Sequence, residues 1–221
     1  MPAADPSTPT GQERPVLLFQ GDSITNAGRR RGGPPNHPHS LGSGYAALAA
    51  SALLSADPDR GWRCYNRGVG GDTVADLAAR WADDCLALAP DVVSVLVGIN
   101  DLWGAGPGED AAARYEEQLR SLLDRTRSAL PDVTLLIGEP FVVPGGSAVD
   151  ATWPSALQPY RGAAQRGAAD AGATWIPYQS VFDEALRDAP GPYWAADGIH
   201  PTPAGHYRMA QAWLEAFRTR H

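Results

Sequence analysis

The sequence contains no lysine, because all 18 residues in the pooled lysine and arginine count are arginines. This absence excludes reactions that need a lysine amine: Schiff-base chemistry, pyridoxal phosphate anchoring, the phosphate contact of a P-loop and a Ser–Lys dyad. Codon bias explains the absence, since alanine, glycine, proline and arginine are all frequent. The chemical exclusion holds whatever the cause.

Cysteine is scarce as well, with only Cys64 and Cys85 in 221 residues. One stands in a predicted strand and the other in a predicted helix, and they do not form a CxxC pair. Two thiols cannot build a disulfide framework or a cysteine-rich zinc site. We therefore expect two small buried hydrophobic residues, and a single disulfide between them stays open.

Long apolar runs and basic clusters are also missing. No apolar stretch approaches the ~18 residues of a membrane span, and a net charge of −7 without a basic stripe argues against nucleic acid or an anionic membrane as partner. Residues 1–15 lack the basic start and apolar centre of a signal peptide, so we expect a cytoplasmic protein. Residues 1–14 are predicted to be a disordered tail, followed by a single domain over residues 15–221.

Apolar runs without alternation predict strands that are covered on both faces, as in a parallel sheet. The clear runs are residues 16–19, 91–97 and 133–137, and weaker candidates are 62–65 and 174–176. Apolar stripes with helical spacing lie between or after them, over residues 45–53, 74–88, 115–126 and 210–217. This alternation predicts one doubly wound α/β domain. Glycine- and proline-rich stretches at 32–44, 104–108 and 144–159 are interpreted as its loops.

In such a sheet, ligands bind beyond the carboxyl ends of the strands. The first strand leads to Gly21-Asp22-Ser23. A serine on a glycine-led turn between strand and helix is held outward and can act as a nucleophile, although the GxSxG signature is missing. Taken alone, the pattern also fits a turn with a helix-capping serine.

The segment after the second strand, residues 66–73, is rich in glycine. Thr73 and Asp76 have the spacing of a capping box, which places the N–H groups of Gly70 and Gly71 at a helix N-terminus that stabilises negative charge. A dinucleotide site is a competing use of such glycines. However, the run fails GxGxxG at Thr73 and no suitable acid follows about twenty residues later. A plain tight turn is the remaining alternative.

Two further patterns carry polar side chains suited to ester chemistry. Asn100 follows the third strand, and its neutral amide can donate to a developing oxyanion without titrating; an Asx turn is the alternative. Near the C-terminus, Asp197 precedes His200 by three residues. A carboxylate this close can orient an imidazole that accepts a proton from a serine elsewhere. The alternative is a surface contact between the two side chains.

Other candidate residues are less specific. His37 and His39 lie in a proline-rich loop without the carboxylates or HExxH pattern of a metal site, so we expect neither a metal nor a cofactor. The basic run 29–31 fits a solvated loop or a contact to an acidic or sugar substrate. Tryptophan faces suit a pyranose ring but equally fit a core or a subunit interface. The residues concerned are Trp103, Trp153 and Trp194.

Four blocks in one order resemble the GDSL/SGNH hydrolase family. They are Gly21-Asp22-Ser23, Gly71, Gly98-x-Asn100-Asp101 and Asp197-x-x-His200, and the resemblance extends from Leu17 to about Phe217. It implies a flavodoxin-like, three-layer α/β/α sandwich with a central parallel sheet of about five strands. It also implies ester hydrolysis without a metal. The family motif begins Gly-Asp-Ser-Leu, and this chain has the conservative substitution Ile24.

The family resemblance also implies roles for individual residues. It maps the nucleophile onto Ser23, the base onto His200 and the residue that orients this base onto Asp197. The oxyanion hole maps onto the backbone N–H groups of Ser23 and Gly71 and onto the side-chain amide of Asn100. These assignments predict a serine esterase that works through an acyl-enzyme.

A narrower likeness is to the intracellular acetylxylan esterases, whose members deacetylate xylo-oligosaccharides. It rests on residues 41–45, 66–68, 80–81 and 98–103. It implies a small acylated sugar as partner, with Asp22, Trp103 and Trp194 as candidate substrate-binding residues. The alternatives are a lysophospholipase or thioesterase-type lipid hydrolase and a non-catalytic carbohydrate-binding protein. The sugar, the ester position and the oligomeric state, including a homo-oligomer, stay open.

Overall fold

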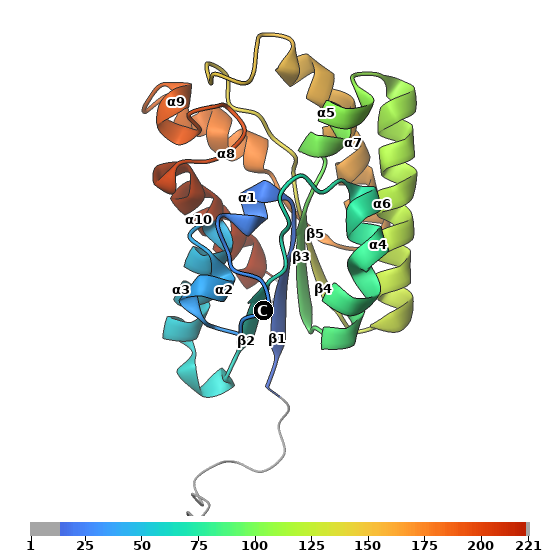
Figure 1. Cartoon of the computed structure of the whole chain (residues 1–221), viewed down its shortest axis with the longest axis vertical. Coiled ribbons are helices and arrows are strands. Elements are labelled where there is room, and N and C mark those ends of the chain that lie inside the picture. The colour runs from blue at the N-terminus through green and yellow to red at the C-terminus, as the bar shows by residue number, and fades with distance from the viewer. Residues whose placement is uncertain (1–13, 220–221) are drawn as a thin grey trace, which may run out of the picture.

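The computed structural model describes residues 14–219, which contain one sheet of five parallel strands (Figure 1). The strands are β1 (Val16–Gly21), β2 (Arg63–Asn66), β3 (Val92–Leu96), β4 (Thr134–Gly138) and β5 (Thr174–Ile176). Their spatial order is β2-β1-β3-β4-β5, the order of the flavodoxin-like doubly wound fold. The predicted strands and fold class are confirmed.

Helices cover both faces of this sheet (Figure 1). One layer contains α3 (Tyr45–Ala56), α8 (Tyr178–Ala185) and α10 (Pro203–Arg218). The other contains α4 (Val74–Asp84), α6 (Glu109–Ala129) and α7 (Trp153–Asp170). Short helical segments occupy the connections: α1 (Ser23–Asn26), α2 (Pro38–Leu41), η1 (Pro58–Arg60), η2 (Leu86–Leu88), α5 (Ile99–Ala105) and α9 (Gly191–Trp194). Because both faces are covered, every residue of β1 and β3 is buried.

A buried indole lies in the helix layer on each side of the sheet; one contacts the sheet itself and the other joins α4 to α6. On one side, the ring centroid of Trp213 lies 5.1 Å from that of Phe19, and its indole N–H donates to Ser94 Oγ at 2.9 Å. On the other side, the Trp81 N–H donates to Thr126 Oγ1 at 2.9 Å. Each buried indole therefore contributes a large apolar surface without leaving its one donor unsatisfied.

The strand register sets where the functional segments leave the sheet. Gly21 at the end of β1 pairs with Leu96 at the end of β3, and Phe19 pairs with Asn66 at the end of β2. The chain segments that follow these three strands therefore leave the sheet at one edge, side by side. This is the edge at the top of Figure 1.

Some expectations about loops and cysteines are corrected. The stretch 144–159 is a loop only as far as 152, because α7 begins at Trp153 with Pro154 in its first turn and Leu157 fully buried. The stretches 32–44 and 104–108 likewise contain α2 and the end of α5. Cys64 and Cys85 are buried free thiols, Cys85 lies just after α4, and burial raises the pKa of both to about 12.

The expectation for the tail, residues 1–14, lies outside the described residues except for Arg14. Within residues 14–219, no helix is both long enough and apolar enough to cross a membrane.

Candidate active site

A serine, a histidine and an aspartate from opposite ends of the chain meet at the carboxyl edge of the sheet. Ser23 opens α1 directly after β1, whereas Asp197 and His200 lie in the turn between α9 and α10. Ser23 Oγ lies 2.8 Å from His200 Nε2, and His200 Nδ1 lies 2.6 Å from Asp197 Oδ2. With Nδ1–H directed at the carboxylate, Nε2 is free to accept the serine proton.

The aspartate is held by its own turn. Its Oδ1 accepts the backbone N–H groups of Ile199 at 2.8 Å and His200 at 2.7 Å, which leaves Oδ2 for the imidazole. Burial pushes the pKa of Asp197 upward, but the hydrogen bonds from His200 and Ile199 outweigh it and bring the pKa below its ordinary value. The carboxylate therefore stays ionised at neutral pH and can stabilise an imidazolium.

The loop at residues 143–149 packs onto the turn at residues 197–200, which carries the aspartate and the histidine. The Val143 N–H donates to Gly198 O at 2.8 Å, and the Ala148 N–H donates to Asp197 O at 2.9 Å. The backbones are so close that a Cβ atom on Gly146 would lie 2.0 Å from Gly198 N. The 143–149 loop thus fixes the backbone that carries the aspartate.

The serine stands on an equally crowded turn. Gly21 has φ 153°, and a Cβ atom there would lie 2.3 Å from Leu96 O, so only glycine fits. Asp22 is the N-cap of α1, where its Oδ1 accepts the Ile24 N–H at 2.9 Å. The alternative of a capping serine is therefore wrong: Asp22 caps the helix, and the Ser23 hydroxyl is left for His200.

The glycine-rich segment after β2 forms a turn beside the serine. The capping box predicted for α4 is confirmed, with Thr73 and Asp76 exchanging hydrogen bonds. A Cβ atom on Gly70 would lie 3.8 Å from Ser23 Cβ, so the turn passes directly next to the serine. Gly71 follows with φ 87°.

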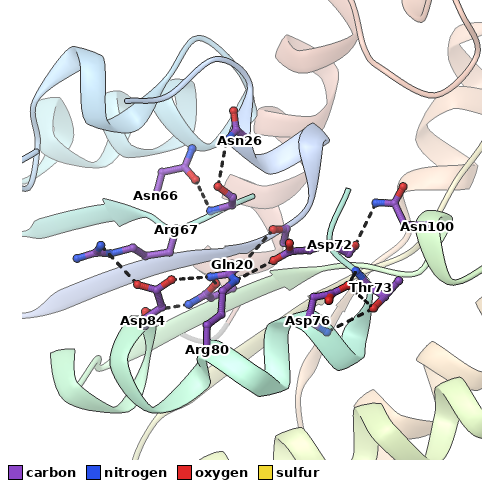
Figure 2. A network of polar contacts seen from close by, with 12 residues as sticks. Gln20, Asn26, Asn66, Arg67, Asp72, Thr73, Asp76, Arg80, Asp84 and Asn100 are labelled. Atoms are coloured by element: carbon purple, nitrogen blue, oxygen red, sulfur yellow. Dashed lines mark hydrogen bonds and ion pairs between the residues drawn. The ribbon is translucent and has the colours of Figure 1, made fainter. Parts of the chain in front are cut away.

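Asn100 reaches this turn from the first turn of α5. Its amide donates to Asp72 O at 3.0 Å, as Figure 2 shows. An Asx turn would use the Asn100 side-chain oxygen as an acceptor within its own segment, whereas this hydrogen bond uses the amide nitrogen as a donor and crosses to another segment. The arrangement brings the segments of Ser23, Gly71 and Asn100 together, which are the residues expected to supply oxyanion donors.

Comparison with known proteins identifies the family. The description "GDSL-like Lipase/Acylhydrolase family" belongs to a family model that matches residues 19–208. This chain belongs to that family. It is therefore a carboxylic ester hydrolase.

Similar proteins in this family cover nearly the whole chain. An acetylxylan esterase of Geobacillus stearothermophilus is 33% identical over 204 residues, which span 90% of this chain and 91% of that enzyme. A solved structure described as a GDSL-like lipase from Parabacteroides merdae is 38% identical with a TM-score of 0.88, covering 93% of this chain and 96% of that one. An alpha/beta hydrolase from the metagenome of Lake Arreo, Spain, is 32% identical with a TM-score of 0.81, covering 94% and 96%.

Two expected substrate-binding residues of this acylhydrolase lie inside the protein. Asp22 is 1% exposed, and Trp194 is 6% exposed with its N–H donating to Ala189 O at 3.0 Å. Neither offers a surface to a sugar, so that expectation is wrong for both. Trp103, in contrast, is 61% exposed, and its ring centroid lies 5.2 Å from that of Trp153.

The two rings of Trp103 and Trp153 border a cavity of about 260 Å³ between α5 and the start of α7. Trp103 stands on the same short helix as Asn100. An aromatic surface therefore begins one helical turn from an expected oxyanion donor. Trp153 was recognised in the sequence only as a residue able to stack on a sugar, and its pairing with Trp103 depends on where α7 begins.

Two buried charges next to the site were not expected from the sequence. Arg29 is only 8% exposed and donates to Gly68 O at 2.6 Å, so the solvated-loop interpretation fails for this residue. Burial lowers its pKa to about 10. Asp101, buried in α5, accepts the Val74 N–H at 3.1 Å, and burial raises its pKa to about 6. The sequence around Asp101 does not indicate that it accepts a hydrogen bond at the start of α4, because Asp101 and Val74 are 27 residues apart.

We expect Gly146→Ala to impair catalysis, because the added methyl group meets the backbone of the 197–200 turn, which carries Asp197 and His200. Displacing a catalytic group by about 1 Å costs on the order of 100-fold, so kcat should fall by about 10- to 100-fold. The measurement is steady-state hydrolysis of p-nitrophenyl acetate. Gly162→Ala is the control, since its methyl group would meet only the flexible end of Arg166, at 3.3 Å. A wild-type kcat for Gly146→Ala would show that the 143–149 loop does not hold the turn.

We expect Asp22→Asn to change how stability depends on pH. Burial is the main cause that raises the pKa of Asp22 from 3.8 to about 7. Between these values the folded protein keeps a proton that the unfolded chain has released, so this stability is lost as pH rises through 7.

Asparagine carries no such proton. The Tm of Asp22→Asn relative to wild type should therefore increase between pH 5 and pH 8. Thermal denaturation at both pH values measures this difference, with the exposed Asp59→Asn as control. A Tm difference that is constant with pH would contradict the raised pKa.

Proposed function

We propose that this ester hydrolase is a serine esterase that removes acetyl and other short acyl groups from xylo-oligosaccharides or related sugars. The observation that carries the proposal is the hydrogen-bonded series Ser23–His200–Asp197, with separations of 2.8 and 2.6 Å. The acetylxylan esterase relative supports the acetyl-sugar assignment. Solved variants of that relative described as catalytic mutants replace a serine or a histidine by alanine.

The proposed reaction begins when Ser23 Oγ attacks the acyl carbonyl and its proton moves to His200 Nε2. Asp197 stabilises the resulting imidazolium through Nδ1–H. The tetrahedral intermediate collapses as His200 gives its proton to the leaving sugar hydroxyl, which leaves an acyl-serine. Water then attacks this ester with His200 as base, and the acid leaves.

The proposed oxyanion hole uses the N–H groups of Ser23 and Gly71 and the amide of Asn100. An amide nitrogen has two hydrogens. One of those on Asn100 is directed at Asp72 O, and this contact leaves the second for the oxyanion. Donors fixed before the reaction stabilise the charge that develops in the transition state, which is the largest single contribution in acyl transfer.

The surroundings favour a polar leaving group over a long acyl chain. The His200 side chain is 52% exposed, so the site is open to solvent. The aromatic pair Trp103–Trp153 offers flat faces with solvent access, which suits a pyranose ring. A lipid hydrolase needs an extended apolar groove, whereas the cavity at these rings is small, at about 260 Å³.

Deacetylation of acetylated xylo-oligosaccharides tests the proposal directly. Mass spectrometry before and after treatment should show loss of acetyl groups with the wild-type protein. Ser23→Ala should abolish nearly all of this activity, with an unchanged melting temperature as evidence of folding. A folded Ser23→Ala variant that keeps a tenth of the wild-type rate would overturn the assignment of the nucleophile. Intact oligosaccharides together with active hydrolysis of p-nitrophenyl acetate would overturn only the sugar.

Acyl-chain length separates the sugar esterase from a lipid hydrolase. We expect rates on p-nitrophenyl esters to fall by about 10- to 100-fold from acetate to butyrate, because each added methylene must be accommodated in a site sized for a methyl group. An acetylated sugar should also react faster than a simple alkyl acetate. A rate that rises toward octanoate would support the lysophospholipase or thioesterase alternative.

A further inference from the structure

Arg80 on α4 joins segments that carry the proposed oxyanion donors, although the proposed mechanism gives it no part. Its Nε donates to Asp72 Oδ2 at 2.7 Å, its Nη1 to Gln20 Oε1 at 2.9 Å, and its Nη2 to Gly21 O at 3.4 Å. Nη1 also donates to Asp84 Oδ2, one turn further along α4, at 2.9 Å. Figure 2 shows this guanidinium between the end of β1 and the turn at Asp72.

The partners of Arg80 are in turn bonded to the donor segments. The Gly21 carbonyl also accepts the Val69 N–H at 2.9 Å, which ties the end of β1 to the glycine-rich turn. The backbone carbonyl of Asp72 accepts the Asn100 amide at 3.0 Å. Arg80 therefore contacts the segments of Ser23 and Gly71 directly, and reaches Asn100 through one residue.

The contacts of Arg80 are shielded from water. The side chains of Arg80 and Asp72 are 19% and 11% exposed, and Gln20 is fully buried. Burial raises the pKa of Asp72, and the hydrogen bond from Arg80 opposes this rise. Without the guanidinium, the carboxylate of Asp72 would lose its ion pair with Arg80 while staying shielded from water, which is strongly unfavourable. The turn would then relax toward solvent and carry the Asp72 carbonyl away from Asn100.

We infer that Arg80 is the positioning residue of the oxyanion hole: it sets the relative places of the Ser23, Gly71 and Asn100 donors without touching substrate. This inference rests on the proposed function, because it takes those three groups as the donors. The planar guanidinium is essential, because it donates hydrogen bonds to Asp72, Gln20 and Gly21 in three directions at once. A lysine ammonium on a flexible stem cannot fix all three.

Kinetics of Arg80→Met on p-nitrophenyl acetate test this role independently of the sugar. Since misplacing reacting groups by about 1 Å costs on the order of 100-fold, kcat should fall by about 100-fold with KM nearly unchanged. Arg80→Lys should recover only part of this loss. The control is Arg120→Met, which removes ion pairs with Glu116 on α6 and Asp170 on α7, away from the site, and should leave kcat unchanged. A kcat for Arg80→Met within threefold of wild type would overturn the inference.

A double-mutant cycle with Asn100→Ala separates positioning from general stability. Loss of Asn100 as an oxyanion donor should by itself lower kcat by about 100- to 1000-fold. If Arg80 acts through the same hole, Arg80→Met should lower kcat clearly less in the Asn100→Ala background than in wild type, because only the Ser23 and Gly71 donors are then left to misplace. Losses that multiply would show that Arg80 acts elsewhere and would overturn the inference.

Two further measurements keep the outcomes distinct. Thermal denaturation identifies any variant that does not fold; if Arg80→Met fails to fold, Arg80→Lys decides, and it must lose kcat at unchanged KM. An unchanged kcat in Asn100→Ala would refute the proposed oxyanion hole itself. An unchanged kcat in Arg80→Met, beside a large loss in Asn100→Ala, would refute only the positioning role.

Discussion

The site depends on close contact between backbones at two glycines. At Gly21 a side chain would strike the carbonyl of Leu96, and at Gly146 it would strike the backbone of the 197–200 turn at Gly198. The first contact brings the end of β1 against the end of β3, and the second seats the Asp197 backbone on the 143–149 loop. The geometry of the proposed Ser23–His200–Asp197 series is thus set by rigid main chain, which holds reacting groups more accurately than flexible side chains would.

The sequence predicted the strands and the meeting of Ser23 and His200, but not the burial of individual side chains. Strands shielded on both faces give continuous apolar runs, and the register of a parallel sheet carries their ends to one edge. Whether Asp22 or Trp194 faces solvent depends instead on segments that are distant in sequence. Arg80 stood out in the sequence only within residues 80–81 of the likeness to acetylxylan esterases. Its contacts could not be foreseen, because those to Gln20 and Gly21 span about sixty residues.

Two buried carboxylates connect folding to the electrostatics of the site. Asp22 caps α1 and Asp101 accepts the N–H of Val74 at the start of α4, so each fixes the start of a helix that borders the donors. In each, Oδ2 has no hydrogen-bond partner among the described residues. Burial raises both pKa values, to about 7 and about 6. Their ionisation near neutral pH opposes stability, which is an expected conflict at a functional site.

In the proposed function, the same geometry separates the groups that react with the ester from the surface that would contact the leaving alcohol. The hydrogen-bonded series and the proposed oxyanion donors contact buried main chain and, by our inference, depend on Arg80, whereas the aromatic pair Trp103–Trp153 stands at the rim, on α5 and the start of α7. We expect changes at the rim to alter contacts with the alcohol more than the position of Ser23. Substrate preference within the acylhydrolase family should therefore depend on the loops around α5 and α7. The fold alone does not determine the substrate; the residues at the site do.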